Sequence, residues 1–294
     1  MFTATLIAAD TFDAGDISAA SDRVAATGAQ VLATRWIDEL KALDVDFAGD
    51  AVAVRAAVEG AFHRTDAIVQ KTAERERSLI VADMDSTMIT IECVDELADY
   101  AGIKPQIAEV TERAMRGELD FEEALRSRVA LLEGLAESVI EQCLAERVVI
   151  MPGARALVRT MRALGGMAVL VSGGFTRFAE PVAREIGFNK AIANRLGIRD
   201  GLLTGQVDGD IVGAQTKRQT LQDTLAATGW APEQSLAVGD GANDIPMIEV
   251  AGLGVAYHAK PKTAAAAHAC VNHGDLTAIL YAMGYPRARW ATLD

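Results

Sequence analysis

Cysteines, aromatic residues and long apolar runs are all scarce in this sequence. The three cysteines, Cys93, Cys143 and Cys270, are odd in number and far apart, so they predict neither a disulfide framework nor a zinc site and suit a reducing compartment. No stretch approaches the roughly 18 to 20 apolar residues that span a bilayer. The N-terminal segment lacks the positive flank and apolar run of a signal peptide. We therefore expect a cytoplasmic protein that has no membrane partner.

Positive charge is also in short supply. The chain has 28 Lys and Arg residues against 41 Asp and Glu residues, which gives a net charge of −13. A general nucleic-acid-binding protein needs a basic surface to meet phosphate backbones, so no nucleic-acid partner is expected. A small anionic substrate, held by a few local donors, is still compatible with this balance.

Half of the 294 residues are hydrophobic, which is enough for a packed core and more chain than one compact domain usually holds. Residues 1–70 predict a small α/β domain, in which no chemical motif occurs. Asp16 is its candidate helix N-cap. The expected elements are strands at 3–9 and 30–36 and helices at 16–27 and 51–77.

Beyond residue 78, short and continuously apolar runs alternate with helical stretches. Three runs end in polar loops: 79–82 leads into DMDST (83–87), 167–171 into SGG (172–174), and 235–238 into GDGAND (239–244). Further strands are expected at 253–257 and 269–271, and helices at 154–164, 178–186 and 215–228. This alternation predicts a doubly wound parallel sheet, whose ligands bind beyond the carboxyl ends of the strands.

An insertion at 92–147 separates the first two strands of this predicted sheet. It is rich in Glu, Leu, Ala and Arg and shows helical spacing at Leu125, Val129 and Leu132. We interpret it as a helical cap over the carboxyl edge of the sheet. The catalytic core would then comprise residues 71–91 and 148–294.

Acidic side chains gather in the first and third polar loops. Asp83 and Asp85 repel each other unless a cation lies between them or one of them is protonated. Asp240 arrives from another strand with Asp244 close behind. Oxygen ligands of this kind suit Mg²⁺, and no cluster of His or Cys indicates zinc. An isolated D-x-D is usually a solvated turn, but three polar loops at equivalent strand ends weigh against that interpretation.

The second polar loop predicts an anion cradle. Ser172 offers a hydroxyl, and Gly173 and Gly174 offer unobstructed backbone N–H groups. Lys217, at the start of a predicted helix, would bring a positive charge to the same place. Taken singly, each signal is weak, because Ser-Gly-Gly is common in turns and a lone lysine usually faces solvent.

Together and in this order, DMDST, SGG, Lys217 and GDGAND resemble the four signatures of the haloacid dehalogenase-like phosphatases. Within that superfamily, Glu92 and the segments 115–135 and 255–261 resemble the phosphoserine phosphatases. The resemblance covers about residues 78–285. Residues 1–70 look like a shortened ACT-type regulatory fold, to which no ligand-binding role is carried over.

The resemblance assigns catalytic roles to the acidic residues. It implies that Asp83 is the nucleophile that forms an aspartyl-phosphate, and that Asp85 acts as general acid and then as general base. Mg²⁺ would bind the Asp83 and Asp240 carboxylates and the Asp85 carbonyl, while Asp244 would orient a metal-bound water.

The resemblance also assigns the substrate contacts. Ser172, the Gly173 N–H and Lys217 would hold the phosphoryl oxygens, and Asn243 would help to place the substrate or Lys217. In the cap, Glu92 suits the ammonium of phosphoserine and Arg128 suits its carboxylate. The expected apolar wall of the closed pocket comprises Met115 and Phe121. Without the resemblance, Glu92 and Arg128 would pass for ordinary helix-surface charges.

The resemblance therefore implies Mg²⁺-dependent hydrolysis of O-phospho-L-serine to L-serine and phosphate, the last step of serine biosynthesis. Two alternatives stay open: hydrolysis or transfer of phosphate with another small phosphomonoester, and a non-catalytic amino-acid sensor. The intact set of Asp83, Asp85, Asp240 and Asp244 argues against a degenerate scaffold. The sequence does not fix the oligomeric state, and a homodimer built on the N-terminal domain is one option.

Overall fold

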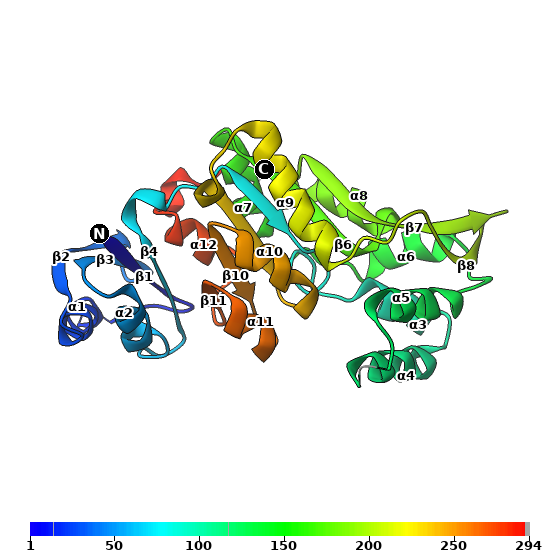
Figure 1. Ribbon diagram of the computed structural model, residues 1–294, viewed down its shortest axis with the longest axis horizontal. Coiled ribbons are helices and arrows are strands. Elements are labelled where there is room, and N and C mark those ends of the chain that lie inside the picture. Colours follow the sequence, from blue (N-terminus) through cyan, green and yellow to red (C-terminus); the bar gives the residue numbers. More distant parts are fainter. Residues whose placement is uncertain (14, 117, 292–294) are drawn as a thin grey trace.

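The computed structural model describes residues 1–13, 15–116 and 118–291, apart from the side chain of Met115. The molecule is elongated, and a small N-terminal sheet and a set of cap helices lie at opposite ends of a central α/β unit (Figure 1). Within the described residues, no helix has both the length and the hydrophobicity that crossing a bilayer requires.

The N-terminal unit is a complete βαββαβ arrangement of the ferredoxin-like type. Its antiparallel sheet has the order β2-β3-β1-β4. The elements are β1 (Phe2–Ala8), α1 (Asp16–Ala26), β2 (Gln30–Asp38), β3 (Ala42–Ala48), α2 (Ala51–Val58) and β4 (Thr65–Lys71). The predicted small α/β domain is thus confirmed, but the expectation of a shortened fold is wrong.

The predicted helix at 51–77 is wrong as well. Helix α2 ends at Val58, where Gly60 turns the chain with a φ of +69°. The β-branched residues Thr65, Ile68 and Val69 then favour strand β4 over further helix, and a short 3₁₀ helix, η1 (Thr72–Glu74), follows. Gly15, rather than Asp16, occupies the N-cap position of α1.

The central sheet confirms the predicted doubly wound parallel architecture. Its order is β11-β10-β9-β5-β6-β7-β8, and its neighbours run parallel except for the antiparallel pair β7–β8. The strands are β5 (Leu79–Ala82), β6 (Met167–Phe175), β7 (Lys190–Arg199), β8 (Leu202–Asp208), β9 (Ser235–Gly239), β10 (Leu253–Tyr257) and β11 (Ala269–Val271). The sequence analysis did not identify the hairpin formed by β7 and β8.

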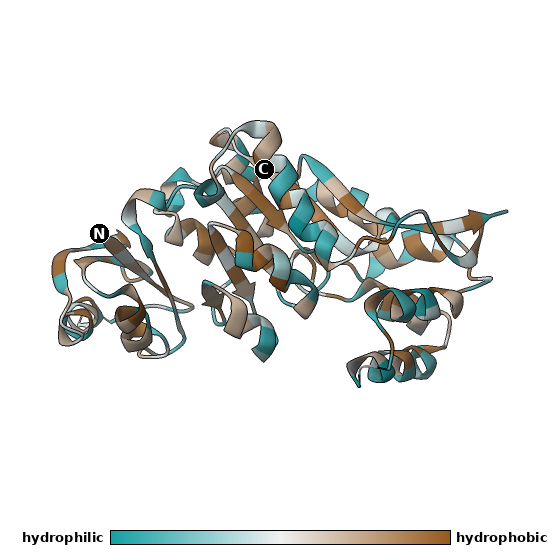
Figure 2. Cartoon of the chain, in the orientation of Figure 1, coloured by the Kyte–Doolittle hydropathy of each residue, from teal (hydrophilic) through white to brown (hydrophobic). Residues whose placement is uncertain are grey.

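Helices cover both faces of this sheet. They are α7 (Ala154–Ala163), α8 (Thr176–Ile186), α9 (Ala214–Thr228), α10 (Ile245–Val250), α11 (Pro261–Ala266) and α12 (Thr277–Ala282), with 3₁₀ helices η2 (Pro232–Gln234), η3 (Ala242–Asp244) and η4 (Arg287–Arg289). In β5, Ile80 packs into one hydrophobic cluster and Leu79 and Val81 pack into another. Because both faces are buried, β5 is apolar throughout and is among the most hydrophobic parts of the molecule (Figure 2).

The cap is a group of four helices inserted after β5. They are α3 (Cys93–Tyr100), α4 (Lys104–Met115), α5 (Phe121–Ala130) and α6 (Ser138–Glu146). Helix α5 begins with a capping box, in which the Asp120 side chain accepts from the Glu123 N–H at 2.8 Å and Glu123 accepts in return at 3.0 Å. The chain enters and leaves the cap through neighbouring segments that are joined by an antiparallel bridge between Ile89 and Ile150.

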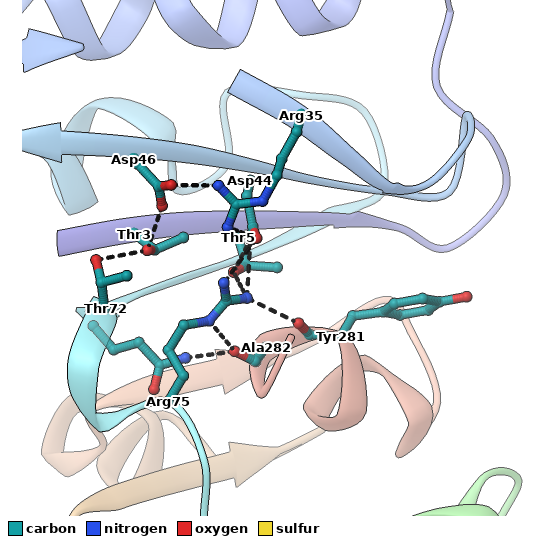
Figure 3. A network of polar contacts seen from close by, with 10 residues as sticks. Thr3, Thr5, Arg35, Asp44, Asp46, Thr72, Arg75, Tyr281 and Ala282 are labelled. Atoms are coloured by element: carbon teal, nitrogen blue, oxygen red, sulfur yellow. Dashed lines mark hydrogen bonds and ion pairs between the residues drawn. The ribbon is translucent and has the colours of Figure 1, made fainter. Parts of the chain in front are cut away.

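A buried polar network attaches the N-terminal unit to the central unit (Figure 3). Arg75 is only 7% exposed, and its guanidinium donates to both carboxylate oxygens of Asp44 on β3, at 2.7 and 3.0 Å. The same group donates to the carbonyls of Tyr281 and Ala282 at the end of α12, at 3.3 and 3.0 Å. A second attachment is Asp66, whose carboxylate accepts hydrogen bonds from the backbone N–H groups of residues 272–274.

Candidate active site

A cavity of about 340 Å³ lies where the carboxyl ends of the central strands meet the cap. The register of the sheet aligns Ala82 of β5 with Leu170 of β6 and Val238 of β9, so the three polar loops emerge side by side. The cavity is lined by the predicted residues Asp83, Asp85, Glu92, Phe121, Arg128, Ser172, Gly173, Asp240 and Asn243.

The first loop places alternate side chains in the core and at the cavity. Met84 is fully buried in the hydrophobic core, which leaves Asp83 and Asp85 on the cavity side. The Met84 N–H donates to Asp83 Oδ1 at 2.7 Å. Ser86 has a φ of +55°, and its hydroxyl donates to Glu92 Oε1 at 2.7 Å. This turn therefore ties the catalytic loop to the first residue of the cap.

Lys217 is fully buried beneath the cavity and carries its charge between two carboxylates. Its Nζ lies 2.7 Å from Asp83 Oδ1 and 2.6 Å from Asp244 Oδ1. Burial opposes the ammonium charge, but the Coulombic attraction of Asp83 and Asp244 outweighs it and raises the pKa of Lys217. The lysine thus stays charged and fixes the orientation of the Asp83 carboxylate.

Asp244 organises the third loop. While Oδ1 accepts from Lys217, Oδ2 accepts from the backbone N–H groups of Asp240 and Gly241, at 3.1 and 3.0 Å. This packing leaves no room for a side chain at Gly239, where a Cβ would lie 2.3 Å from the Asp244 carboxylate. Residue 239 must therefore be glycine as long as the Asp244 carboxylate occupies this position.

The carboxylates of Asp83, Asp240 and Asp244 form a cluster that fits a metal ion, with one oxygen of each lying within 4.8 Å of the others. Burial raises the pKa of Asp240, and the negative charge of Asp83 adds to that effect. A bound cation would relieve this repulsion. The donors are all oxygen atoms, as hard divalent cations require.

Asp85 occupies a different environment from Asp83. Its Oδ1 is buried and accepts or donates no hydrogen bond. Burial, together with the negative charges of Glu92 and Asp83, raises the pKa of Asp85 to about 8. Asp85 is therefore mostly protonated at neutral pH, whereas Asp83 is paired with a lysine. The two carboxyl groups of one loop thus lie in different electrostatic environments, as an acid and a nucleophile need.

The anion cradle is braced by a residue that the sequence analysis missed. Strand β6 continues through SGG to Phe175, and its register shifts between Val171 and Phe175. Asn194 on β7 is buried, donates to the Gly173 carbonyl at 2.8 Å and accepts from the Val212 N–H at 2.8 Å. It thereby fixes the cradle against the segment that leads into α9 and Lys217. No motif marks Asn194, because the β7–β8 hairpin carries no apolar run.

The cap closes the cavity with Phe121 and Arg128. The Phe121 ring rests on two core glycines, since a Cβ at Gly173 or Gly213 would lie 3.2 or 3.3 Å from it. Arg128 is half-buried, and its one hydrogen bond among the described residues is weak, from Nε to the Ala124 carbonyl at 3.4 Å. The side chain of Met115 lies outside the described part of the chain, so its role in the wall stays a prediction.

Lys260 also lines the cavity and was not predicted. Its N–H donates to the Asp240 carbonyl at 3.2 Å, and its charge partly offsets the rise in the pKa of Asp240. The only available signal was its position in the segment 255–261, whose role the sequence did not define.

Residues 80–249, more than half of the chain, match the family described as haloacid dehalogenase-like hydrolase. The chain belongs to this family.

This haloacid dehalogenase-like hydrolase is 49% identical over 207 residues to phosphoserine phosphatase from Albidiferax ferrireducens, which covers 69% of this chain and 87% of that protein. The crystal structure of a probable phosphoserine phosphatase from Vibrio cholerae is 34% identical, with a TM-score of 0.78, and covers 98% of this chain and 89% of the other. A substrate-bound phosphoserine phosphatase complex is 36% identical, with a TM-score of 0.65, over 70% of this chain and 98% of the other.

This hydrolase matches only part of the length of three other phosphoserine phosphatases. The chain spans 65%, 63% and 54% of the lengths of those from Haemophilus influenzae, Streptomyces coelicolor and Mycobacterium tuberculosis, respectively. The match to the Streptomyces coelicolor protein includes 95% of this chain, so the similarity extends into the N-terminal unit.

Proposed function

We propose that this hydrolase converts O-phospho-L-serine to L-serine and inorganic phosphate. The observation that carries the proposal is one cavity in which Asp83, paired with a lysine, and Asp85, whose pKa burial raises, lie below a cap. The cap presents one acidic and one basic side chain, Glu92 and Arg128. The relatives named phosphoserine phosphatase support the same substrate. The reaction is the last step of serine biosynthesis and would take place in the cytoplasm.

In the first half-reaction, an Asp83 carboxylate oxygen attacks phosphorus. A bond forms between Asp83 and the phosphoryl group, and the bond from phosphorus to the seryl oxygen breaks. Asp85 gives its proton to the departing seryl oxygen. Meanwhile Lys217, the Ser172 hydroxyl and the Gly173 N–H stabilise the phosphoryl oxygens, whose charge redistributes during transfer.

In the second half-reaction, water attacks the phosphorus of the aspartyl-phosphate. Asp85, now ionised, accepts a proton from this water, and the bond between Asp83 and phosphorus breaks to release inorganic phosphate. The proton taken up restores Asp85 to its starting state, so the cycle balances.

The cap selects the amino-acid part of the substrate. Arg128 has no carboxylate partner among the described residues, so its planar guanidinium is free to bind the substrate carboxylate in a bidentate manner. Glu92, which its bond from Ser86 holds at the cavity wall, faces the ammonium group. Phe121 and Asn243 line the same cavity. In the proposed reaction, Phe121 excludes water from the reacting atoms and Asn243 helps to place the substrate.

Mg²⁺ fits the acidic cluster as the cofactor of the proposed reaction. Asp83, Asp240 and the Asp85 carbonyl would hold it, and Asp244 would act from outside through its bonds to the loop backbone and Lys217. When bound, the ion supplies positive charge that offsets the repulsion between the Asp83 carboxylate and the phosphoryl oxygens.

A phosphate-release assay on O-phospho-L-serine tests this proposal. Wild-type enzyme should release phosphate, lose activity with EDTA and regain it when Mg²⁺ is restored. Asp83→Asn should abolish turnover while the circular-dichroism spectrum stays native, and Asp223→Asn, at an exposed position on α9, should leave turnover unchanged. A panel of other phosphomonoesters, with homoserine as an added acceptor, separates the alternative substrates. Near-normal turnover by Asp83→Asn would contradict the nucleophile assignment.

A further inference from the structure

A second cavity, of about 360 Å³, lies between the N-terminal unit and the central sheet, away from the active site. Its walls come from α2 and β4 on one side and from the start of β10 and the residue before β11 on the other. The linker residue Arg77 completes it. Of the charged groups that line this cavity, Arg55, Lys71 and Arg77 are basic and only Glu74 is acidic, in a protein whose net charge is −13.

Arg77 is the unusual residue of this cavity. It is 7% exposed, its Nε is buried without a hydrogen-bond partner, and no carboxylate forms an ion pair with it in the described part of the chain. Its other donors reach neutral acceptors only: Gln70 Oε1 at 2.8 Å and, weakly, the Glu76 carbonyl at 3.4 Å. Gln70 is itself held by the Ala282 carbonyl at 2.7 Å, so its oxygen is fixed toward Arg77. A buried charge whose hydrogen-bond acceptors are all neutral is costly.

The neighbouring basic residues differ from Arg77. Arg55 is paired with Glu59 at 3.2 Å, and Lys71 is paired with Glu74 at 2.9 Å. Both pairs are partly or largely exposed to water, where such pairs contribute little energy and exchange partners readily. The side chains of Arg55 and Lys71 are therefore able to turn toward an added anion. Arg77 forms no ion pair with any described residue that such an anion would have to displace.

His268 adds a neutral N–H donor, which can form a hydrogen bond with an anion. Its Nδ1 accepts a hydrogen bond from the Gly254 N–H at 2.8 Å, which leaves the proton on Nε2. Partial burial lowers the pKa of His268, and the charges of Arg55 and Arg77 lower it further. Burial likewise lowers the pKa of Arg77 to about 10, an effect that Glu74 partly offsets and Arg75 increases. Both shifts reflect burial of these groups next to other positive charges.

We propose that this cavity binds a small, doubly charged oxyanion, either a phosphate or a dicarboxylate, through Arg77, Arg55, Lys71 and His268. The anion supplies the counter-charge that Arg77 lacks. Because Arg55 and Lys71 belong to the N-terminal unit and His268 belongs to the central unit, the bound anion bridges the two and stabilises their association. This site is independent of the proposed hydrolysis, and either assignment can fail without the other.

His268 provides a reporter that the active site cannot mimic, because no histidine lines the catalytic cavity as described. Its imidazole resonances, assigned with a His268→Gln variant, are followed by NMR in the full chain during titration with inorganic phosphate or succinate. Sodium chloride of equal ionic strength is the reference. A saturable shift with phosphate alone identifies a phosphate site, with succinate alone a dicarboxylate site, and with both a general oxyanion site.

Arg77→Gln should weaken this binding by about tenfold or more, as expected for the loss of a charge-assisted contact. Lys71→Gln, at a side chain that is 59% exposed, gives a second test that does not endanger folding and should weaken binding by a smaller factor. Ser172→Ala alters only the catalytic cradle, and Lys190→Gln removes a distant exposed lysine; both should leave the His268 shift unchanged. If His268 does not respond to either anion, the site does not exist. The same conclusion follows if both Arg77→Gln and Lys71→Gln bind the anion as tightly as the wild type.

Discussion

Arg128 illustrates how its surroundings make one side chain available for binding a substrate carboxylate. It lies on α5, where neighbouring arginines have different partners: Arg126 is paired with Glu122 at 2.7 Å on the outer surface, whereas Arg128 turns toward the cavity. Burial lowers the pKa of Arg128, and Asp95 and Glu92 partly offset this effect. A half-buried guanidinium without a fixed carboxylate is suited to receive one from a substrate.

Arg128→Ala should therefore reduce kcat/KM for O-phospho-L-serine by about 10- to 100-fold, the usual range for a lost charged hydrogen bond. Its effect on an aryl phosphate that has no carboxylate should be much smaller. Arg126→Ala is the matched control and should change neither value. Steady-state kinetics on both substrates decide the matter, and equal losses on the two would remove Arg128 from carboxylate recognition.

The sequence predicted which residues gather at this cavity better than it predicted the residues that support them. Motif order indicated Asp83, Asp85, Ser172, Lys217 and Asp240, and all of them lie around one cavity or directly beneath it. Lys217 on its own would have been taken for a surface lysine, since only the fold shows that two carboxylates enclose it. Asn194 gave no signal at all, because its role depends on backbone groups that are distant in the sequence.

At the scale of elements, α5 contacts the core through Phe121, which packs against glycines at the edge of the cavity. Gly213 precedes α9 with φ −128° and ψ −161°, a conformation that any residue adopts without strain. Its lack of a side chain is explained instead by Phe121, whose ring would lie 3.3 Å from a Cβ at this position. Glycine is therefore needed at position 213 to leave room for the Phe121 ring of the cap, and not for its backbone conformation.

Gly213→Val should push the Phe121 ring away and reduce kcat/KM by about 10- to 100-fold, the scale expected for a small misplacement of an active-site wall. In a Phe121→Ala background the same substitution should cost nothing further, since the ring it displaces is gone. Gly15→Val, at another glycine that precedes a helix and has open space around it, controls for the effect on helix capping. Additive losses in the double variant would contradict this contact.

Elements with a strong local pattern were predicted, and elements that depend on tertiary pairing were not. The apolar runs of β5 and β9 reflect burial on both faces, so they were visible in the sequence. Strand β7 mixes exposed, half-buried and buried positions without a regular alternation, and it pairs with β8 through a turn at Asp200 and Gly201, both at positive φ. In the N-terminal unit, alanine content suggested helix across residues 51–77, but Gly60 and the pairing of β4 with β1 overrode that local preference.

For the whole molecule, Arg75 determines how firmly the N-terminal unit is attached. Helix α12 is short. At its end, the Tyr281 carbonyl accepts from the Gly284 N–H at 2.8 Å and the Ala282 carbonyl accepts from Gln70 Nε2 at 2.7 Å. Arg75 bonds to both of them and to Asp44, so one guanidinium caps a core helix and neutralises a buried carboxylate of the N-terminal sheet (Figure 3). Arg35 also reaches Asp44, at 2.9 Å, but it is 47% exposed.

Arg75→Met should therefore lower the free energy of unfolding by about 3 kcal/mol or more, since it removes one partner of a buried ion pair and one hydrogen bond from each of two helix-end carbonyls. Arg35→Met, which removes the exposed partner of the same carboxylate, should cost about 1 kcal/mol or less. Urea denaturation measures both values. Hydrogen exchange should show faster opening of residues 277–282 in Arg75→Met alone, because only that variant removes hydrogen bonds from the end of α12. If the two variants lose equal stability and α12 keeps its protection, then Arg75 is not what holds the N-terminal unit to the core, and the Asp66 attachment to residues 272–274 must carry that role instead.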